Sequence, residues 1–121
     1  MTDAEIQART ILEALIKTEF SECAPITREF AELTTKPGIY AVRHRVDGLL
    51  YVGKAQDIRD RFRGGHKAIT WSWITDYDHK DVAIASYTLD FMQWRALSSE
   101  LEGIILNISK PPFNARIPMR D

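Results

Sequence analysis

Two short tripeptides, Gly38-Ile39-Tyr40 and Tyr51-Val52-Gly53, most constrain how this chain folds. Each joins a tyrosine to a β-branched residue and a glycine, in mirrored order, and Asp47-Gly48 lies between them. β-Branched and aromatic residues favour strands, and an Asp-Gly pair favours the tight turn of a hairpin. The pattern therefore predicts a β-hairpin with strands over residues 39–45 and 49–52 and a tyrosine in each strand.

A short helix is expected directly after this hairpin. Asp57 has the position of a helix N-cap, and Asp60 that of the first turn, where a carboxylate is favourable. Ile58 and Phe62 are four residues apart and would bury together on one face. Gly64-Gly65 is expected to end the helix.

Two longer helices are expected, one at each end of the chain. Residues 2–20 predict an amphipathic helix. Its apolar positions near one face are Ile6, Leu12, Leu15, Ile16 and Phe20. Asp90 is a candidate N-cap for a second helix over residues 91–107. The apolar stripe of this helix holds Trp94, Leu97, Leu101, Ile104 and Ile105.

The segment between the hairpin unit and the last helix predicts one strand. Residues 82–89 form a β-branched, alternating run typical of a strand. Residues 68–81 fit no single element, because Trp71 and Trp73, two residues apart, suit either a strand or an extended loop. These two tryptophans have two open interpretations, as stacking surfaces for bases or as core residues.

These elements predict a small α+β fold, with a three-stranded antiparallel sheet flanked by helices. A length of 121 residues is that of one domain. Within it we expect residues 1–35 to form an N-terminal helical extension and residues 36–121 to hold the hairpin unit. The extra N-terminal helix would either cover the sheet or mediate formation of a homodimer.

The charge is distributed unevenly along the chain. The net charge is −1, yet residues 36–67 hold eight basic and three acidic side chains, or +5. A strongly basic protein with broad affinity for nucleic acid is therefore not expected, whereas a local basic face that meets phosphates is. Cys23 is the one cysteine, which excludes a disulfide framework. The sequence has no apolar run long enough for a bilayer and no signal-peptide pattern, so a cytoplasmic protein without a membrane partner is expected.

The paired tripeptides resemble the two motifs of the GIY-YIG nuclease family. Gly38-Ile39-Tyr40 matches the first motif, and Tyr51-Val52-Gly53 matches the second with valine in place of isoleucine. The following Lys54-Ala55 is similar to the N-terminal incision domain of the bacterial excision-repair nuclease. Arg61 stands eight residues after Gly53, where the family places an arginine on a helix.

The resemblance continues to the last part of the chain. Glu102 lies in a Leu-Glu context on the predicted last helix, and a KPPFN sequence that ends at Asn114 follows. This order of motifs covers about residues 37–114. The family resemblance implies a GIY-YIG-like fold in which Gly38 and Gly53 shape the motifs.

The resemblance also implies an activity, that of a divalent-metal-dependent endonuclease that hydrolyses DNA. Tyr40 would act as the general base towards water, and Tyr51 would assist or position the phosphate. Glu102 would supply an oxygen ligand to Mg²⁺ or Mn²⁺, and Arg61 would pair with a phosphate oxygen through its planar fork. Tyrosine is a weak base at its reference pKa of roughly 10, and nearby cations such as Lys54 would favour its ionised form.

Several positions keep more than one interpretation. Lys54, Arg59 and Arg63 are expected to bind substrate, with solvated or backbone-contacting side chains as the alternative. Asn114 would either bind substrate or close the C-terminal loop. Glu100 competes with Glu102 as the metal ligand.

His66 departs from the family pattern. Family members often carry a histidine or tyrosine four residues after the helix arginine, and this chain has Gly65 there, with His66 one position later. Either the double glycine bends the chain and brings His66 into the catalytic site, or His66 is an exposed residue at a helix end.

Two functions from different classes remain open at this point. The first is the DNA endonuclease, acting in DNA repair or in a mobile element, alone or as part of a larger nuclease assembly. The second is a catalytically inactive GIY-YIG-like module that binds nucleic acid or another protein. The near-neutral net charge and the displaced His66 favour the second function, whereas the complete set of Tyr40, Arg61 and Glu102 favours the first.

Overall fold

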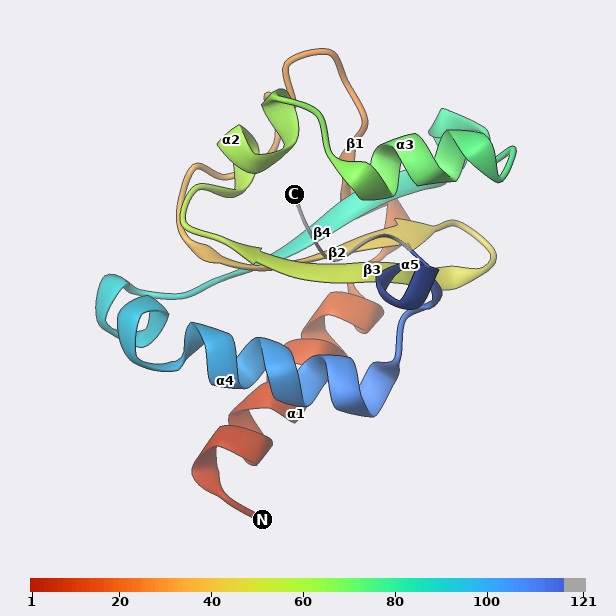
Figure 1. Cartoon of the computed structure of the whole chain (residues 1–121). Helices are drawn as coiled ribbons and strands as arrows, with labels where there is room; N and C mark the ends of the chain where they lie inside the picture. Colours follow the sequence, from red (N-terminus) through yellow and green to blue (C-terminus); the bar gives the residue numbers. More distant parts are fainter. Residues whose placement is uncertain (117–121) are drawn as a thin grey trace.

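A computed structural model describes residues 1–116 of the chain (Figure 1). One antiparallel sheet lies between two helical layers, with α2 and α3 on one face and α1 and α4 on the other. The helices are α1 (Asp3–Lys17), α2 (Ile58–Arg63), α3 (Lys67–Ile74), α4 (Phe91–Ser109) and α5 (Pro112–Arg116). The strands are β1 (Ala24–Pro25), β2 (Gly38–His44), β3 (Gly48–Ala55) and β4 (Val82–Thr88). The end of the predicted unit 36–121, from residue 117 onward, lies outside the described residues.

The sheet has four strands in the order β1-β4-β2-β3, so the prediction of three strands was wrong. The predicted hairpin and the predicted strand after it are confirmed as β2, β3 and β4. The additional strand β1 pairs Ala24 with Ile84 and Pro25 with Ala83. Two residues are too few to form an alternating pattern, and proline is tolerated only at a sheet edge, where β1 lies.

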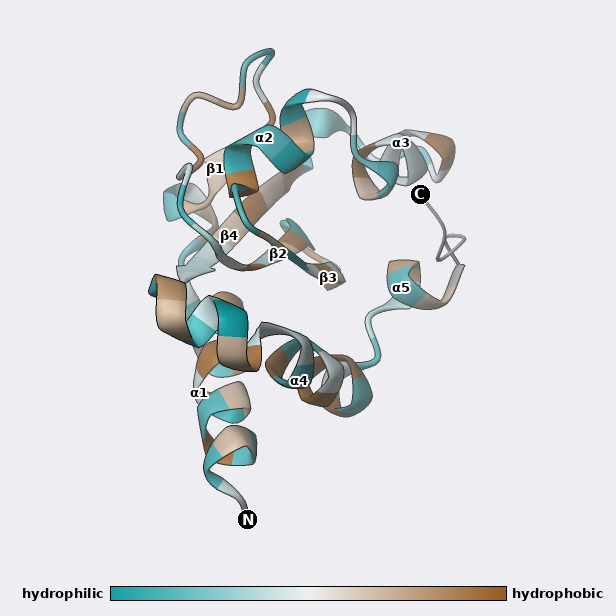
Figure 2. Cartoon of the chain, turned by 60° about the vertical axis from the view of Figure 1, so that its left-hand side comes forward, coloured by the Kyte–Doolittle hydropathy of each residue, from teal (hydrophilic) through white to brown (hydrophobic). Residues whose placement is uncertain are grey.

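The central strand β2 carries apolar side chains on both faces of the sheet. Tyr40 and Val42 face α2 and α3, whereas Ile39 and Ala41 face α1 and α4. A strand that is covered on both faces reads as a continuous apolar run. Figure 2 shows the sheet held between these two helical layers. The first tyrosine motif, on β2, is therefore anchored in the most buried part of the fold.

The N-terminal helix α1 covers the same face of the sheet as α4. This position matches the prediction that the extra helix covers the sheet. The helix ends at Lys17, earlier than predicted. Its buried face holds Ala8, Ile11, Leu12 and Leu15. Ile6 and Ile16 were wrongly placed on that face, since they are 52% and 48% exposed.

Arg43 fastens the end of α1 to the sheet. From β2 its guanidinium donates hydrogen bonds to the carbonyl oxygens of Leu15 and Thr18. These carbonyls belong to the last turn of α1, where helix carbonyl groups have no partner within the helix. The N-terminal helix thus shares both a core and a polar anchor with the hairpin unit.

Helix α3 is the element that the sequence left undefined. His66 caps it and Thr75 ends it. Two turns of helix with few polar positions show no helical periodicity, and tryptophans two apart fit a strand equally well. Trp71 packs partly buried against the core, whereas Trp73 is 58% exposed and is not a core residue.

Helix α4 forms as predicted and crosses the sheet on the α1 side. Asp90 and Gln93 make a reciprocal capping box at its start. Leu101 and Ile105 are buried, and the other residues of the predicted stripe pack half-buried beside them. Within the described residues, no helix combines the length and the apolar character needed to cross a membrane.

Candidate active site

Tyr40 lies at the centre of the candidate site and is almost fully buried, with 1% of its surface exposed. It stands opposite Gly53 in the β2–β3 ladder. A Cβ atom built on Gly53 would lie 2.5 Å from the Tyr40 hydroxyl oxygen, so the tyrosine ring passes over a position that has no side chain. Gly53 thereby allows the Tyr40 hydroxyl to reach across β3, which is the edge strand.

Gly53→Ala is expected to destabilise the fold and displace Tyr40. The added methyl group would overlap the Tyr40 ring, and overpacking of this kind costs about 1–3 kcal/mol. Urea unfolding of the wild type and of Gly53→Ala measures this loss of stability. Gly103→Ala is the matched control, because nothing lies within 4 Å of its added Cβ and alanine is favoured over glycine inside a helix. Equal stability of Gly53→Ala and the wild type would contradict this packing.

His66 lies beside Tyr40, with its Nε2 atom 2.7 Å from the tyrosine hydroxyl oxygen. The ring is 3% exposed. Gly65 adopts φ +97, a conformation that glycine accommodates readily, and this turn precedes His66. Of the two interpretations of His66, the structure thus matches burial at the tyrosines and not an exposed helix end.

The hydrogen bonds of His66 define its neutral tautomer. Its Nδ1 atom accepts the backbone N–H of Ala68 at 2.9 Å, which caps the start of α3. A neutral imidazole with an accepting Nδ1 carries its proton on Nε2. The Nε2–H group therefore donates to the Tyr40 oxygen. A hydrogen bond donated to this oxygen favours its anionic form.

The aromatic rings around Tyr40 hold the pair in place. Phe62 packs edge-on against Tyr40 at 4.8 Å and stacks on His66 at 4.4 Å. The Tyr51 ring lies 6.3 Å from that of Tyr40 and 5.1 Å from that of His66. Sequence reasoning treated Phe62 only as a core residue. Its place directly after Arg61 and four residues before His66 was the signal for this second role.

Glu102 reaches the same strand edge from the opposite face of the sheet. Its carboxylate lies near the backbone N–H of Lys54, the residue after Gly53. Burial raises the pKa of the Glu102 carboxyl, although the charge and the backbone N–H of Lys54 pull this pKa down. The Tyr40 hydroxyl and the Glu102 carboxylate therefore approach neighbouring residues of β3.

Asn114 on α5 occupies the next outward-facing position of β3. Its side chain accepts the N–H of Val52 and donates to the Val52 carbonyl, each at 2.9 Å. An edge strand exposes such groups, and Asn114 pairs them as a neighbouring strand would. Of the two roles predicted for Asn114, this contact corresponds to closure of the C-terminal loop.

The residues at this edge fit a magnesium ion better than a zinc ion. Glu102 is a partly buried carboxylate whose charge is disfavoured by its surroundings, so a cation there would be stabilised. Mg²⁺ binds through one or two carboxylates and keeps several waters. The described residues include no group of three His, Cys, Asp or Glu side chains able to hold a metal. Glu100, the competing carboxylate, is exposed on α4.

Lys54 and Arg61 lie on different elements, β3 and α2. The Lys54 ammonium lies 5.1 Å from the centre of the Trp94 ring, on the Glu102 side. Arg61 is half-buried on α2 and lines a surface hollow together with Asp57 and Asp60. Both cations thus belong to the segment that follows the second tyrosine motif.

Arg59 and Arg63 contact the segment that precedes β2. Arg59 donates hydrogen bonds to the carbonyl oxygens of Leu33 at 2.8 Å and Ala31 at 3.0 Å. Arg63 forms an ion pair with Glu29 at 3.5 Å. Arg59 therefore contacts the backbone, which was the alternative to substrate binding. Arg63 lies beside the same segment before β2.

Comparison with known proteins finds a family match that spans these motifs. Residues 36–115 match the GIY-YIG catalytic domain. UvrABC system protein C of Chlorobium chlorochromatii is 30% identical over 101 residues, which cover 76% of this chain and 14% of that protein. Proteins of the same name from Streptococcus pneumoniae and Streptococcus gordonii are each 32% identical over 91 residues. In both cases these residues cover 68% of this chain and 13% of the relative. The chain thus spans about 14% of the length of such relatives.

Proposed function

The chain belongs to the GIY-YIG family of nucleases, and from that membership we propose that it is a metal-dependent endonuclease that hydrolyses phosphodiester bonds in DNA. The observation that carries this proposal is the buried Tyr40–His66 pair, whose hydroxyl group crosses Gly53 towards the strand edge that also holds Glu102. A general base that activates water and a carboxylate that can hold a metal ion at the same edge are groups that promote hydrolysis of a phosphodiester.

Tyr40 acts as the general base in this proposal. The N–H group at Nε2 of His66 stabilises the ionised tyrosine oxygen. That oxygen takes a proton from a water molecule while the water oxygen attacks phosphorus and the bond to the leaving oxygen breaks. Burial among Phe62 and Tyr51 holds the tyrosine oxygen in one direction.

The remaining residues bind and neutralise the phosphate. Glu102 would hold Mg²⁺ or Mn²⁺, and such an ion supplies positive charge for the phosphate and for the leaving oxygen. Arg61 would pair with non-bridging oxygens through its planar guanidinium, with Lys54 as a second cation. Tyr51, half-buried beside both Tyr40 and His66, would position the phosphate.

DNA as the substrate is supported by the relatives. The matched proteins carry the name UvrABC system protein C, and the tyrosine motifs resemble the incision domain of the bacterial excision-repair nuclease. The chain spans only about 14% of such a relative. The proposal is therefore confined to this domain and does not include a homodimer or a larger repair assembly. The excess of basic side chains in residues 36–67 provides charge that complements DNA.

Incubation of the purified chain with branched, nicked and linear DNA tests this function. With Mg²⁺ or Mn²⁺ we expect cleavage of at least one of these substrates, and with a chelator we expect none. Cleavage that persists in the chelator would contradict the metal dependence. Binding of DNA without cleavage in either metal would favour the second function, a catalytically inactive nucleic-acid-binding module.

A further inference from the structure

A hollow of about 500 Å³ lies on the far side of His66 from Tyr40. It is formed by the segment before β2, the end of α2 and one side of α3. Its apolar floor consists of Phe30, Phe62 and Ile69, which are all buried residues of the core. A volume of this size is within the range of sites that hold a small organic group.

The wall of the hollow is shared with the candidate active site. His66 and Phe62 line the hollow, and they also stack on each other and contact Tyr40. A molecule in the hollow would therefore touch the ring that donates a hydrogen bond to Tyr40.

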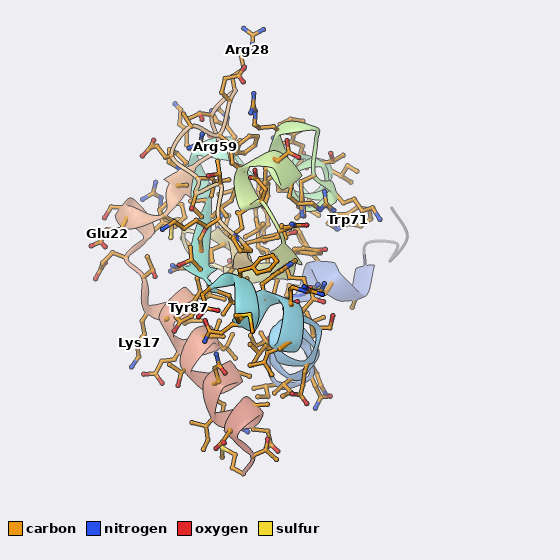
Figure 3. The ribbon with its side chains drawn as sticks, turned by 90° about the vertical axis from the view of Figure 1, so that its left-hand side faces the viewer. Lys17, Glu22, Arg28, Arg59, Trp71 and Tyr87 are labelled. Carbon is orange, nitrogen blue, oxygen red and sulfur yellow. The ribbon has the colours of Figure 1, made fainter. Side chains whose placement is uncertain are left out.

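Two arginines and a histidine lie at the rim of the hollow. Arg28, Arg63 and His79 line it, and among its described lining residues there is no carboxylate. Arg63 forms an ion pair with Glu29 at 3.5 Å, and the His79 ring lies 3.5 Å from the Asp78 carboxylate. The Arg28 side chain extends outward from the loop before β2 (Figure 3). An apolar floor beside the two arginines Arg28 and Arg63 suits a flat apolar group that is attached to a phosphate.

Trp73 provides an aromatic surface at the same rim. It lines the hollow and is 58% exposed. A base stacked on an exposed aromatic side chain is a frequent mode of binding to single-stranded nucleic acid. Two hydroxyl groups, those of Thr27 and Thr70, also line the hollow and could bond to the polar edge of a base.

We propose that this hollow binds an unpaired nucleobase of the DNA strand whose phosphate occupies the active site. The inference rests on the proposed function, because it takes DNA as the ligand. A base inside a continuous duplex is stacked and paired, so it must leave the helix to enter such a site. The hollow therefore selects DNA with an unpaired nucleotide beside the scissile phosphate, and the selected base packs against His66.

A binding measurement without metal tests this site separately from cleavage. The probe is a duplex with a single unpaired 2-aminopurine, and the reference is the same duplex with 2-aminopurine paired. In a chelator the wild type is expected to bind the unpaired probe roughly tenfold more tightly, as one stacked base provides. Stacking in the hollow is also expected to quench the fluorescence of the unpaired 2-aminopurine.

Trp73→Ala is expected to lose both the preference and the quenching, with little change in affinity for the paired duplex. Phe91→Ala is the matched control, since Phe91 is 59% exposed on α4, on the other side of the sheet. Thr70→Trp, which fills the hollow from an exposed position of α3, is expected to lose the preference without removing any core residue.

Equal affinity of the wild type for both probes would overturn the proposal, and so would an equal loss in Trp73→Ala and Phe91→Ala. The two proposals fail independently. Cleavage in Mg²⁺ without any preference for the unpaired probe would remove the base site and leave the nuclease. A preference that Trp73→Ala abolishes, in a chain that cleaves no DNA, would remove the nuclease and leave the base site.

Discussion

Glu102→Gln is expected to lower the rate of DNA cleavage in Mg²⁺ by about a thousandfold or more. Glutamine has nearly the same shape but lacks the charge that would hold the ion, and metal-based charge stabilisation is worth several kcal/mol, at about 1.4 kcal/mol per tenfold in rate. Cleavage rates of a labelled DNA at saturating protein measure this loss. Glu100→Gln is the matched control, because Glu100 is exposed on the same helix. Equal losses in the two variants would contradict the role of Glu102.

The same substitution separates function from stability. Because burial raises the pKa of Glu102, the folded chain binds this proton more tightly than the unfolded chain, and the ionised carboxylate destabilises the fold at neutral pH. Without metal, Glu102→Gln is expected to melt at a higher temperature than the wild type near pH 7. This difference should shrink as the pH falls through the raised pKa towards the ordinary value of 4.5. Mg²⁺ should stabilise the wild type and not the variant.

Tyr40→Phe is expected to lower the cleavage rate by roughly a hundredfold to ten-thousandfold, the usual contribution of a general base. The phenylalanine ring fills the same space over Gly53, so the fold should persist while the oxygen bonded to His66 is lost. Single-turnover cleavage at saturating DNA measures the change. Tyr87→Phe is the control, since Tyr87 lies on β4 and packs against the other core, near α1 (Figure 3). A wild-type rate in Tyr40→Phe would contradict its role as base.

Much of the fold could be predicted because its signals are local. The hairpin follows from two β-branched runs around Asp47-Gly48, and the start of α4 follows from the Asp90 cap. Asp57 accepts the backbone N–H of Asp60, as expected of the N-cap of α2. Strand β1 and helix α3 were not predicted, because each is too short for its periodicity to be recognised and each is stabilised by neighbours distant in sequence.

The candidate site was predictable in its composition but not in its arrangement. The motifs identify Tyr40, Tyr51 and Glu102, yet only the tertiary fold shows that the Glu102 carboxylate lies near the backbone of Lys54, beside Gly53. The double glycine in the sequence left two positions open for His66, and only the structure shows that the backbone of Gly65 and the cap of α3 bury it beside Tyr40. Long-range packing of this kind decides which side chains meet.

Whether Tyr40 and Glu102 form one site is tested most directly by single-turnover cleavage in Mg²⁺. The rates needed are those of the wild type, Tyr40→Phe, Glu102→Gln and the variant with both changes. Residues that act as a unit lose activity non-additively. The doubly substituted chain is therefore expected to cleave no more slowly than the slower single variant. Losses that multiply, or wild-type cleavage by the doubly substituted chain, would contradict a single site at the edge of β3.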